Sequence, residues 1–288
     1  MVSELICPLL SRRPASEPGL SLTLEIIVDY SSLAVTFAIL IAASIKDLET
    51  REVSNTMWMV YAPLSLLLFI GRIVASPANF PIFLVSALAT IVVSFLLFQF
   101  GVMGGADSKA FMCIGMALPV APGILTALWQ PPLFFYPFPI AVLVNSFLLS
   151  MGLAVIILAR NLMRGVSSRG LFRGFEKESI IRKFMMLFTS YKTSFNMLES
   201  RVYLYPAEQV EVTESRPQRR FRFVANAEED REKLVAGLQG YKDTGLFADG
   251  VWVTPGLPHL VFVTASLGVV LVLGDLLMMV FFRLVGFS

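Results

Sequence analysis

The chain has little of the chemistry that builds metal centres. Its 288 residues include two cysteines, Cys7 and Cys113, and a single histidine, His259. Two thiols cannot form a disulfide framework or a four-thiolate zinc site, and one imidazole does not replace the missing ligands. We therefore expect neither a bound metal nor a cofactor, so that any hydrolysis has to be carried out by carboxylates, hydroxyls or amines.

Charge is also scarce. Only 15% of the residues are charged, whereas 56% are hydrophobic and the mean hydropathy is +0.73. A soluble domain has about 25% charged residues, so the deficit indicates that lipid is part of the solvent. The charges cluster, because residues 161–257 hold 15 of the 23 Lys and Arg and 12 of the 21 Asp and Glu. This third of the chain is expected to face water.

Long apolar runs define the expected fold. A membrane-spanning helix needs about 20 mostly apolar residues. Six stretches qualify: 26–45, 56–75, 80–100, 109–129, 138–159 and 258–282. They predict a mainly α membrane protein with six transmembrane helices and a small α+β cytoplasmic domain inserted between helices five and six. The expected division is a lead-in at 1–25 without signal-peptide features, helices one to five at 26–160, the insert at 161–257, and helix six with the C-terminus at 258–288.

The insert shows alternating local patterns. Helical periodicity covers 175–190 and 228–239, and strand-like runs occupy 201–206, 220–225 and 250–255. The apolar positions 184–188 suit either a core or, beside Arg182 and Lys183, a membrane surface. The sequence leaves both interpretations open.

Helix parity fixes the expected topology. With six spans, the loop between the first two helices, the loop between the third and fourth, and the insert share one side. That side carries Lys46, Arg51, Lys109, Arg160 and Arg164 next to the helix ends. The positive-inside bias places it in the cytoplasm. We therefore expect a multi-pass protein of the cell membrane.

Asp107 lies in G-G-A-D, directly before the fourth apolar run. Gly104 and Gly105 allow another chain to approach closely, and a helix N-terminus favours a carboxylate. A plain N-cap explains the same residues.

Asp47 ends the first apolar run, where the helix dipole gives a carboxylate no local advantage. A solvated loop charge is the alternative interpretation. As a pair, however, Asp47 and Asp107 share a side and a depth, whereas Asp29 and Asp275 belong to the opposite face. Two such carboxylates that share one proton can activate water and protonate a leaving group. His259, at the entrance of the last helix, is expected to be an interfacial residue and Asp275 a packing residue.

A family resemblance follows from these motifs. The stretch K-D-L-E-T-R-E-V-S-N at 46–55 and G-G-A-D at 104–107 resemble the type IV prepilin peptidases, and most closely their archaeal preflagellin peptidase branch. The family consists of intramembrane aspartyl proteases of the GxGD type. Ser54 replaces the family's proline before Asn55, and Ala106 replaces the second glycine, as the archaeal version of the motif allows. The resemblance covers the helical part of the chain, and the insert adds little to it.

The resemblance implies an activity and a substrate class. Asp47 and Asp107 would be the catalytic pair, with Gly104, Gly105, Ala106 and Asn55 as motif residues. The substrate would be a preflagellin or pilin-like precursor whose short basic leader is cut at the cytoplasmic membrane face. Glu49 and Glu52 could attract that leader, although pairing with Lys46 and Arg51 or exposure to water is the favoured explanation of both. The bacterial branch often carries a Cys-x-x-Cys pair and methylates its product; this chain lacks such a pair, so peptidase activity alone is expected.

Other function classes stay open. Presenilin-type proteases also use two aspartates, but they have Tyr before the first and a later Pro-Ala-Leu, both absent here. An ion- or proton-coupled transporter could use paired intramembrane acids. A non-catalytic scaffold acting through 161–257 is a third class. We expect the bilayer and precursor proteins as partners, and no nucleic acid.

Overall fold

The computed structural model describes residues 18–129, 137–167, 170–213, 216–223 and 231–286. The first seventeen residues, which include Cys7 and most of the expected lead-in, lie outside these ranges. The elements are α2 (Pro18–Thr50), α3 (Asn55–Ala75), η2 (Pro77–Asn79), α4 (Phe80–Gln99), α5 (Gly105–Ala117), α6 (Phe138–Ser167), α7 (Ile180–Thr189), β1 (Tyr191–Thr193), α8 (Phe195–Ser200), β2 (Leu204–Pro206), β3 (Glu208–Thr213), β4 (Arg216–Phe221), α9 (Arg231–Gln239), η3 (Lys242–Thr244), β5 (Val251–Pro255), α10 (His259–Val272) and α11 (Leu276–Val285).

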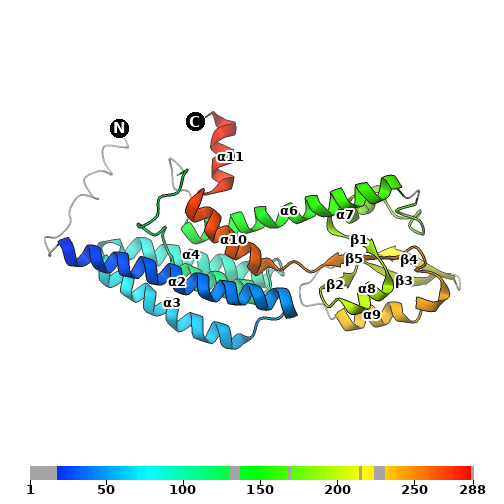
Figure 1. Cartoon of the computed structure of the whole chain (residues 1–288), viewed down its shortest axis with the longest axis horizontal. Coiled ribbons are helices and arrows are strands. Elements are labelled where there is room, and N and C mark those ends of the chain that lie inside the picture. Colours follow the sequence, from blue (N-terminus) through cyan, green and yellow to red (C-terminus); the bar gives the residue numbers. More distant parts are fainter. Residues whose placement is uncertain (1–17, 130–136, 168–169, 214–215, 224–230, 287–288) are drawn as a thin grey trace.

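The fold is mainly helical, with a bundle at one end and a small sheet at the other (Figure 1). Among the described residues, four helices are long and apolar enough to cross a membrane: α2, α3, the α4 segment from 77 to 99, and α6. The bent pair α10 and α11 makes a fifth if it counts as one span. The expected six spans are therefore not confirmed.

The fourth expected span, 109–129, is wrong as a single helix. Helix α5 has 13 residues, begins at Gly105 and ends at Ala117. Two prolines, Pro119 and Pro122, follow directly, and proline disfavours helical backbone at and before its own position. The chain from 118 to 129 is consequently irregular, and Ser86 of α4 donates a hydrogen bond to the carbonyl of Pro119.

The last expected span, 258–282, is broken rather than continuous. Helix α10 ends at Val272, and α11 leaves it at an angle of 52° (Figure 1). Gly274 at the break has a φ of 95°, which favours glycine, and Asp275 then caps α11 by accepting from the N–H of Met278 at 3.1 Å. Asn145 of α6 binds both sides of the break, through the Gly274 carbonyl and the Leu276 N–H. Asp275, expected to be a packing residue, is thus a helix cap.

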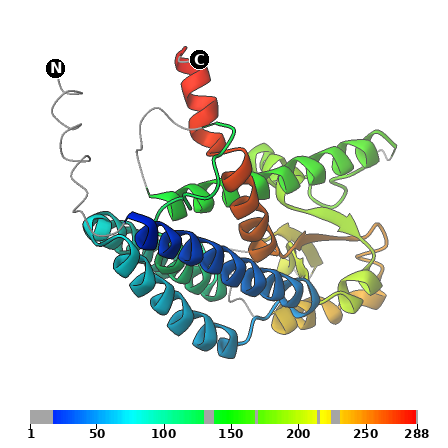
Figure 2. The same ribbon diagram turned by 60° about the vertical axis from the view of Figure 1, so that its left-hand side comes forward.

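The core of the bundle surrounds α5. Its Phe111 and Ile114 are completely buried, together with Leu40 of α2 and Tyr61 of α3. Figure 2 shows α2 and α3 side by side with α10 lying across α2. The short α5 therefore has long helices and α10 around it, which fixes the position of its first turn.

The insert contains a three-stranded antiparallel sheet in the order β1-β5-β2 and a β3–β4 hairpin. The central strand β5 is buried along Val251, Trp252 and Val253. The expected helices correspond to α7 and α9, and the expected strands at 201–206 and 250–255 correspond to the shorter β2 and β5. The strand expected at 220–225 is displaced: β4 begins four residues earlier and shares only 220–221 with the pattern, whose positions 224 and 225 lie outside the described residues.

A buried ion pair ties the hairpin to the sheet. Arg219 of β4 donates to both carboxylate oxygens of Glu208 at 2.8 and 2.9 Å, and Glu208 also accepts from the Trp252 N–H. Arg219 extends to Asp249, which in turn pairs with Lys192. Charges buried this far from water are stable only when paired, so this network holds the insert in one arrangement.

Candidate active site

Asp47 lies one turn before the C-terminus of α2. The helix ends at Thr50 because Arg51 adopts a left-handed φ of 61°, and no other non-glycine residue in the described part of the chain has a positive φ. The guanidinium of Arg51 stacks over the ring of Tyr203 in the insert at 5.5 Å. The turn that closes α2 is therefore linked to the insert, directly beside the Asp47 carboxylate.

Asp107 lies in the first turn of α5, where the helix dipole stabilises a negative charge. Gly104 is the extended N-cap residue, and a Cβ on it would stand 3.3 Å from the Asp107 carboxylate. A Cβ on Gly105 would stand 3.4 Å from the ring of Phe98. Both glycines thus leave room, the first for the carboxylate itself and the second for α4. Ala106 packs against the core of the bundle.

Both carboxylates contact the start of α10. The Asp47 carboxylate accepts from the backbone N–H of Leu260 at 3.3 Å. The preceding side chain, His259, places Nδ1 3.5 Å from Oδ2 of Asp107. Consecutive residues of one helix N-terminus therefore contact both aspartates. This convergence brings together two residues 60 positions apart in the sequence.

His259 is held on three sides. Its Nε2 lies 3.4 Å from the hydroxyl of Ser146, and its ring lies 5.1 Å from the ring of Phe147, both on α6. The side chain is 12% exposed, and that of Asp107 is 16% exposed. The expectation of an ordinary interfacial residue missed this placement. The signal in the sequence was that the chain's single histidine stands at the entrance of a membrane helix.

The other predicted site residues are placed as follows. Asn55, the first residue of α3, accepts from the ammonium of Lys109 at 2.7 Å and so links α3 to α5. Glu49 pairs with Lys46 at 2.9 Å on the exposed surface. Glu52 is exposed and lies in the turn after α2. These three residues lie in the helix ends and the turn next to the aspartates, and their hydrogen bonds and ion pairs are made with other residues.

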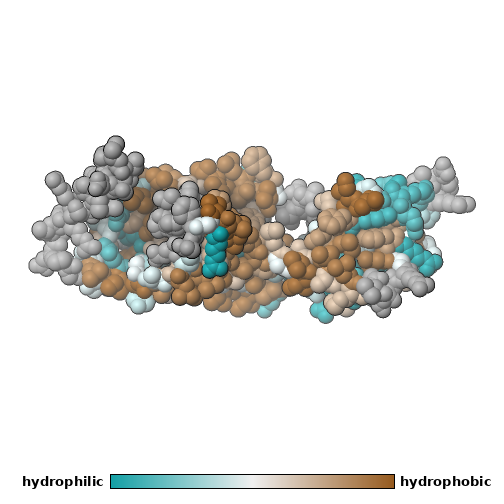
Figure 3. All heavy atoms as spheres, turned by 90° about the horizontal axis from the view of Figure 1, so that it is seen from above, coloured by the Kyte–Doolittle hydropathy of each residue, from teal (hydrophilic) through white to brown (hydrophobic). Residues whose placement is uncertain are grey.

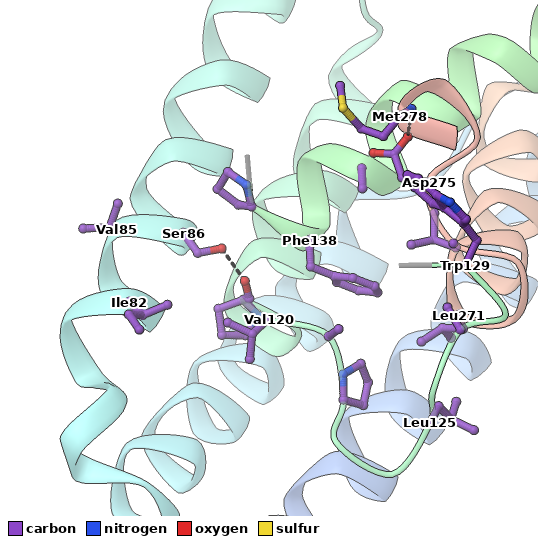
Figure 4. A pocket seen from close by; sticks show the side chains of 18 of the residues that line it. Ile82, Val85, Ser86, Val120, Leu125, Trp129, Phe138, Leu271, Asp275 and Met278 are labelled. Carbon is purple, nitrogen blue, oxygen red and sulfur yellow. Dashed lines mark hydrogen bonds between the residues drawn. The ribbon is translucent and has the colours of Figure 1, made fainter. Parts of the chain in front are cut away.

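Asp29 lies in the N-terminal half of α2, 18 residues before Asp47. It pairs with Arg72 of α3 at 2.8 Å and accepts from the N–H of Gly123 at 2.7 Å. A separate cavity of about 790 Å³ lies between α4, α6 and the break before α11 (Figure 4). Its lining is almost entirely apolar, and it contains neither Asp47 nor Asp107. The cavity is therefore distinct from the candidate active site.

The described residues contain no group of three or more His, Cys, Asp or Glu side chains that could hold a metal ion. The chemistry available where Asp47 and Asp107 contact the start of α10 is that of two carboxylates, one imidazole and one backbone N–H. This set can bind, deprotonate and position a water molecule beside an amide carbonyl.

Comparison with known proteins finds two matching families. Residues 34–159 match the type IV leader peptidase family, and residues 182–276 match the archaeal Peptidase A24 C-terminus of type II. The chain is thus similar to these peptidases over the bundle and over most of the insert. The first match contains the helices that carry both aspartates, and the second contains most of the insert and α10.

Several curated relatives of this chain carry the name preflagellin peptidase. The protein from Methanococcus voltae is 28% identical over 82% of this chain and 92% of its own length. The one from Methanocaldococcus jannaschii is 26% identical over 86% of this chain and 95% of its own length. A third, from Methanococcus maripaludis, is 24% identical. The similarity thus extends over the bundle and the insert together.

Proposed function

We propose that this chain is a membrane-embedded aspartyl endopeptidase whose catalytic pair is Asp47 and Asp107. The convergence of both carboxylates on His259 and Leu260 is the observation that carries the proposal. Two carboxylates that share one proton can perform both halves of amide hydrolysis. One takes a proton from a water molecule and later passes it to the leaving nitrogen, while the other gives its proton to the carbonyl oxygen and recovers it when the tetrahedral intermediate collapses. Because such groups titrate as a pair, the roles belong to the pair.

In this proposal His259 is a positioning residue. Its imidazole contacts Asp107, while the next residue, Leu260, donates to Asp47. The start of α10 therefore sets the separation of the two carboxylates. Ser146 and Phe147 hold the imidazole from α6, so the geometry of the pair depends on α6 and α10 as well as on α2 and α5, which carry the aspartates.

The proposed substrate is a preflagellin or pilin-like precursor with a short basic leader, processed at the cytoplasmic membrane face. The names of the relatives and the family support a leader peptide as substrate. The exposed carboxylates of Glu49 and Glu52 lie near Asp47 and would attract Lys or Arg of a leader. Basic residues next to the same helix ends support a cytoplasmic orientation.

The test is cleavage by the purified chain in lipid vesicles. We expect a preflagellin with its leader to be shortened at one site, as shown by sequencing the new N-terminus. Asp47→Asn and Asp107→Asn should each abolish the cleavage, whereas Glu49→Gln with Glu52→Gln should raise KM for a basic leader. Unchanged cleavage by either aspartate variant would refute the assignment of the pair.

A further inference from the structure

The apolar face of α7 points away from the protein. On the inner side, Met186 is completely buried against the insert core with Phe175 and Trp252. The outer side carries large apolar side chains with high exposed fractions: Ile180 (84%), Ile181 (73%), Phe184 (61%) and Met185 (46%). These positions lie on one face at helical spacing. A helix on the surface of a soluble domain shows the opposite pattern, with polar residues outward.

Helix α6 presents a similar exposed stripe beside α7. Its apolar side chains on one face remain open over three turns: Met151, Val155, Ile156, Leu162 and Met163, each between 54% and 70% exposed. Residues 138–159 contain no charge. At 1.5 Å per residue this uncharged run is roughly 33 Å long, close to the thickness of a bilayer core. If α6 spans the membrane, the bilayer surface lies near Arg160.

Helix α7 is bound to α6 next to Arg160, the position where the bilayer surface would lie. The side chain of Asn161 donates to the carbonyls of Leu187 and Ser190 at 2.9 and 2.7 Å, where α7 ends. The guanidinium of Arg160 stacks on Tyr191 at 3.8 Å. Figure 3 shows that the face seen from above is apolar over the bundle and again over part of the insert, where hydrophilic side chains adjoin it.

The segment around α7 is strongly basic. Residues 160–189 include seven Lys or Arg and two Glu. One of these acids, Glu178, is buried and already bound to Arg182 and to the Phe221 N–H. Arg182 still has 51% of its side chain exposed. An apolar helix face flanked by arginine and lysine is the composition that binds an anionic membrane surface.

We propose that α7 is an interfacial helix whose apolar face lies in the headgroup region of an anionic bilayer. It would anchor the insert where α6 leaves the membrane. The inference rests on the membrane location proposed above, and it does not depend on the catalytic assignment. Because α7 joins the insert core through Met186, the anchor would fix the insert, and with it Tyr203 beside Arg51, relative to the bilayer.

The test measures the depth of a nitroxide label in the full chain, reconstituted at one copy per nanodisc with anionic lipid. Phe184→Cys carries the label on a Cys7→Ser background, since the remaining Cys113 is buried. Val212→Cys on the β3–β4 hairpin is the matched control, because its exposed fraction of 63% is close to the 61% of Phe184. We expect the ratio of oxygen to water-soluble nickel collisions to be roughly threefold or more higher at 184 than at 212.

Equal ratios at the two positions would overturn the proposal. A high ratio at 184 that appears only when two copies share a nanodisc would assign the face to a second copy and would also overturn it. In nanodiscs of neutral lipid, or with Arg182→Gln and Lys183→Gln, we expect the difference in collision ratio between positions 184 and 212 to shrink. An unchanged difference would refute the proposed attraction of α7 to anionic lipid. No precursor is needed, so the result stands apart from that of the cleavage test.

Discussion

Helix α2 carries two carboxylates with contrasting surroundings, one in its N-terminal half and one in its last turn. Asp29 is 5% exposed, pairs with Arg72 and accepts a backbone N–H, so its charge is compensated within the bundle. In the last turn, Asp47 is only partly buried and accepts one backbone N–H, and Asp107 contacts an imidazole on the adjacent residue of α10. The first arrangement is that of a structural ion pair. The second leaves carboxylate oxygens free for water and a substrate, which is what catalysis needs.

The largest expected effect tests the second arrangement. Asp107→Asn should lower the cleavage rate by a factor on the order of 10² to 10⁴, because amides cannot exchange the shared proton. The melting temperature should change little, since the side chain is partly exposed and its contact with the His259 imidazole is 3.5 Å long. Cleavage kinetics and thermal unfolding in the same vesicles measure both. If the Asp107→Asn variant loses stability but keeps its cleavage rate, Asp107 has a structural role like that of Asp29 rather than a catalytic one.

The first arrangement predicts the reverse pattern at Asp29. Asp29→Leu leaves the Arg72 guanidinium buried without its partner, which costs about 3 to 5 kcal/mol of stability. The double variant Asp29→Leu with Arg72→Met removes both charges and should recover most of that loss. Cleavage per folded molecule should remain within a few-fold of the parent chain. If the single variant unfolds completely, the double variant still decides whether the pair is structural.

His259 should have an intermediate effect, on the order of tenfold in kcat. His259→Leu removes the contact to Asp107, whereas His259→Asn keeps an N–H near the position of Nδ1 and should restore part of the rate. A positioning role predicts a change in kcat and in the pH profile with little change in KM. Loss of melting temperature in step with loss of rate, equal in both variants, would indicate a packing role instead.

The smallest effect concerns the insert, where the charges are structural like Asp29. Burial alone would raise the pKa of Asp249, but the pairs with Lys192 and Arg219 outweigh it and hold that pKa below its ordinary value of 3.8. A depressed native pKa stabilises the fold above the unfolded value, and this contribution is lost as the pH falls through the native pKa. Asp249→Asn should therefore melt earlier than the parent at pH 7, and the difference should shrink steadily as the pH falls below 3.8. A difference that stays constant over that acidic range would contradict the ion-pair explanation.

The apolar pattern of the sequence predicted the long helices of this fold but not the positions where two of the expected helices end or break. The apolar runs predicted the long helices α2, α3, α4 and α6, because hydrophobic length is a local property. The same criterion extended the fourth span through Pro119 and Pro122, where the backbone leaves the helix. It also passed over Gly274, where a φ of 95° and the binding of Asn145 break the last helix. Both errors arose where backbone geometry overrides composition.

The sequence by itself determined which chemical groups are available and where they lie along the chain. These are two aspartates at the ends of apolar runs, glycines before one of them, too few thiols and imidazoles for a metal, and a charged insert. Only the tertiary structure decided that Asp47 and Asp107 contact consecutive residues of one helix start, since they are 60 residues apart and those residues, His259 and Leu260, come more than 150 residues later. Contacts of that range depend on how the helices pack, and packing is a property of the assembled bundle rather than of any segment.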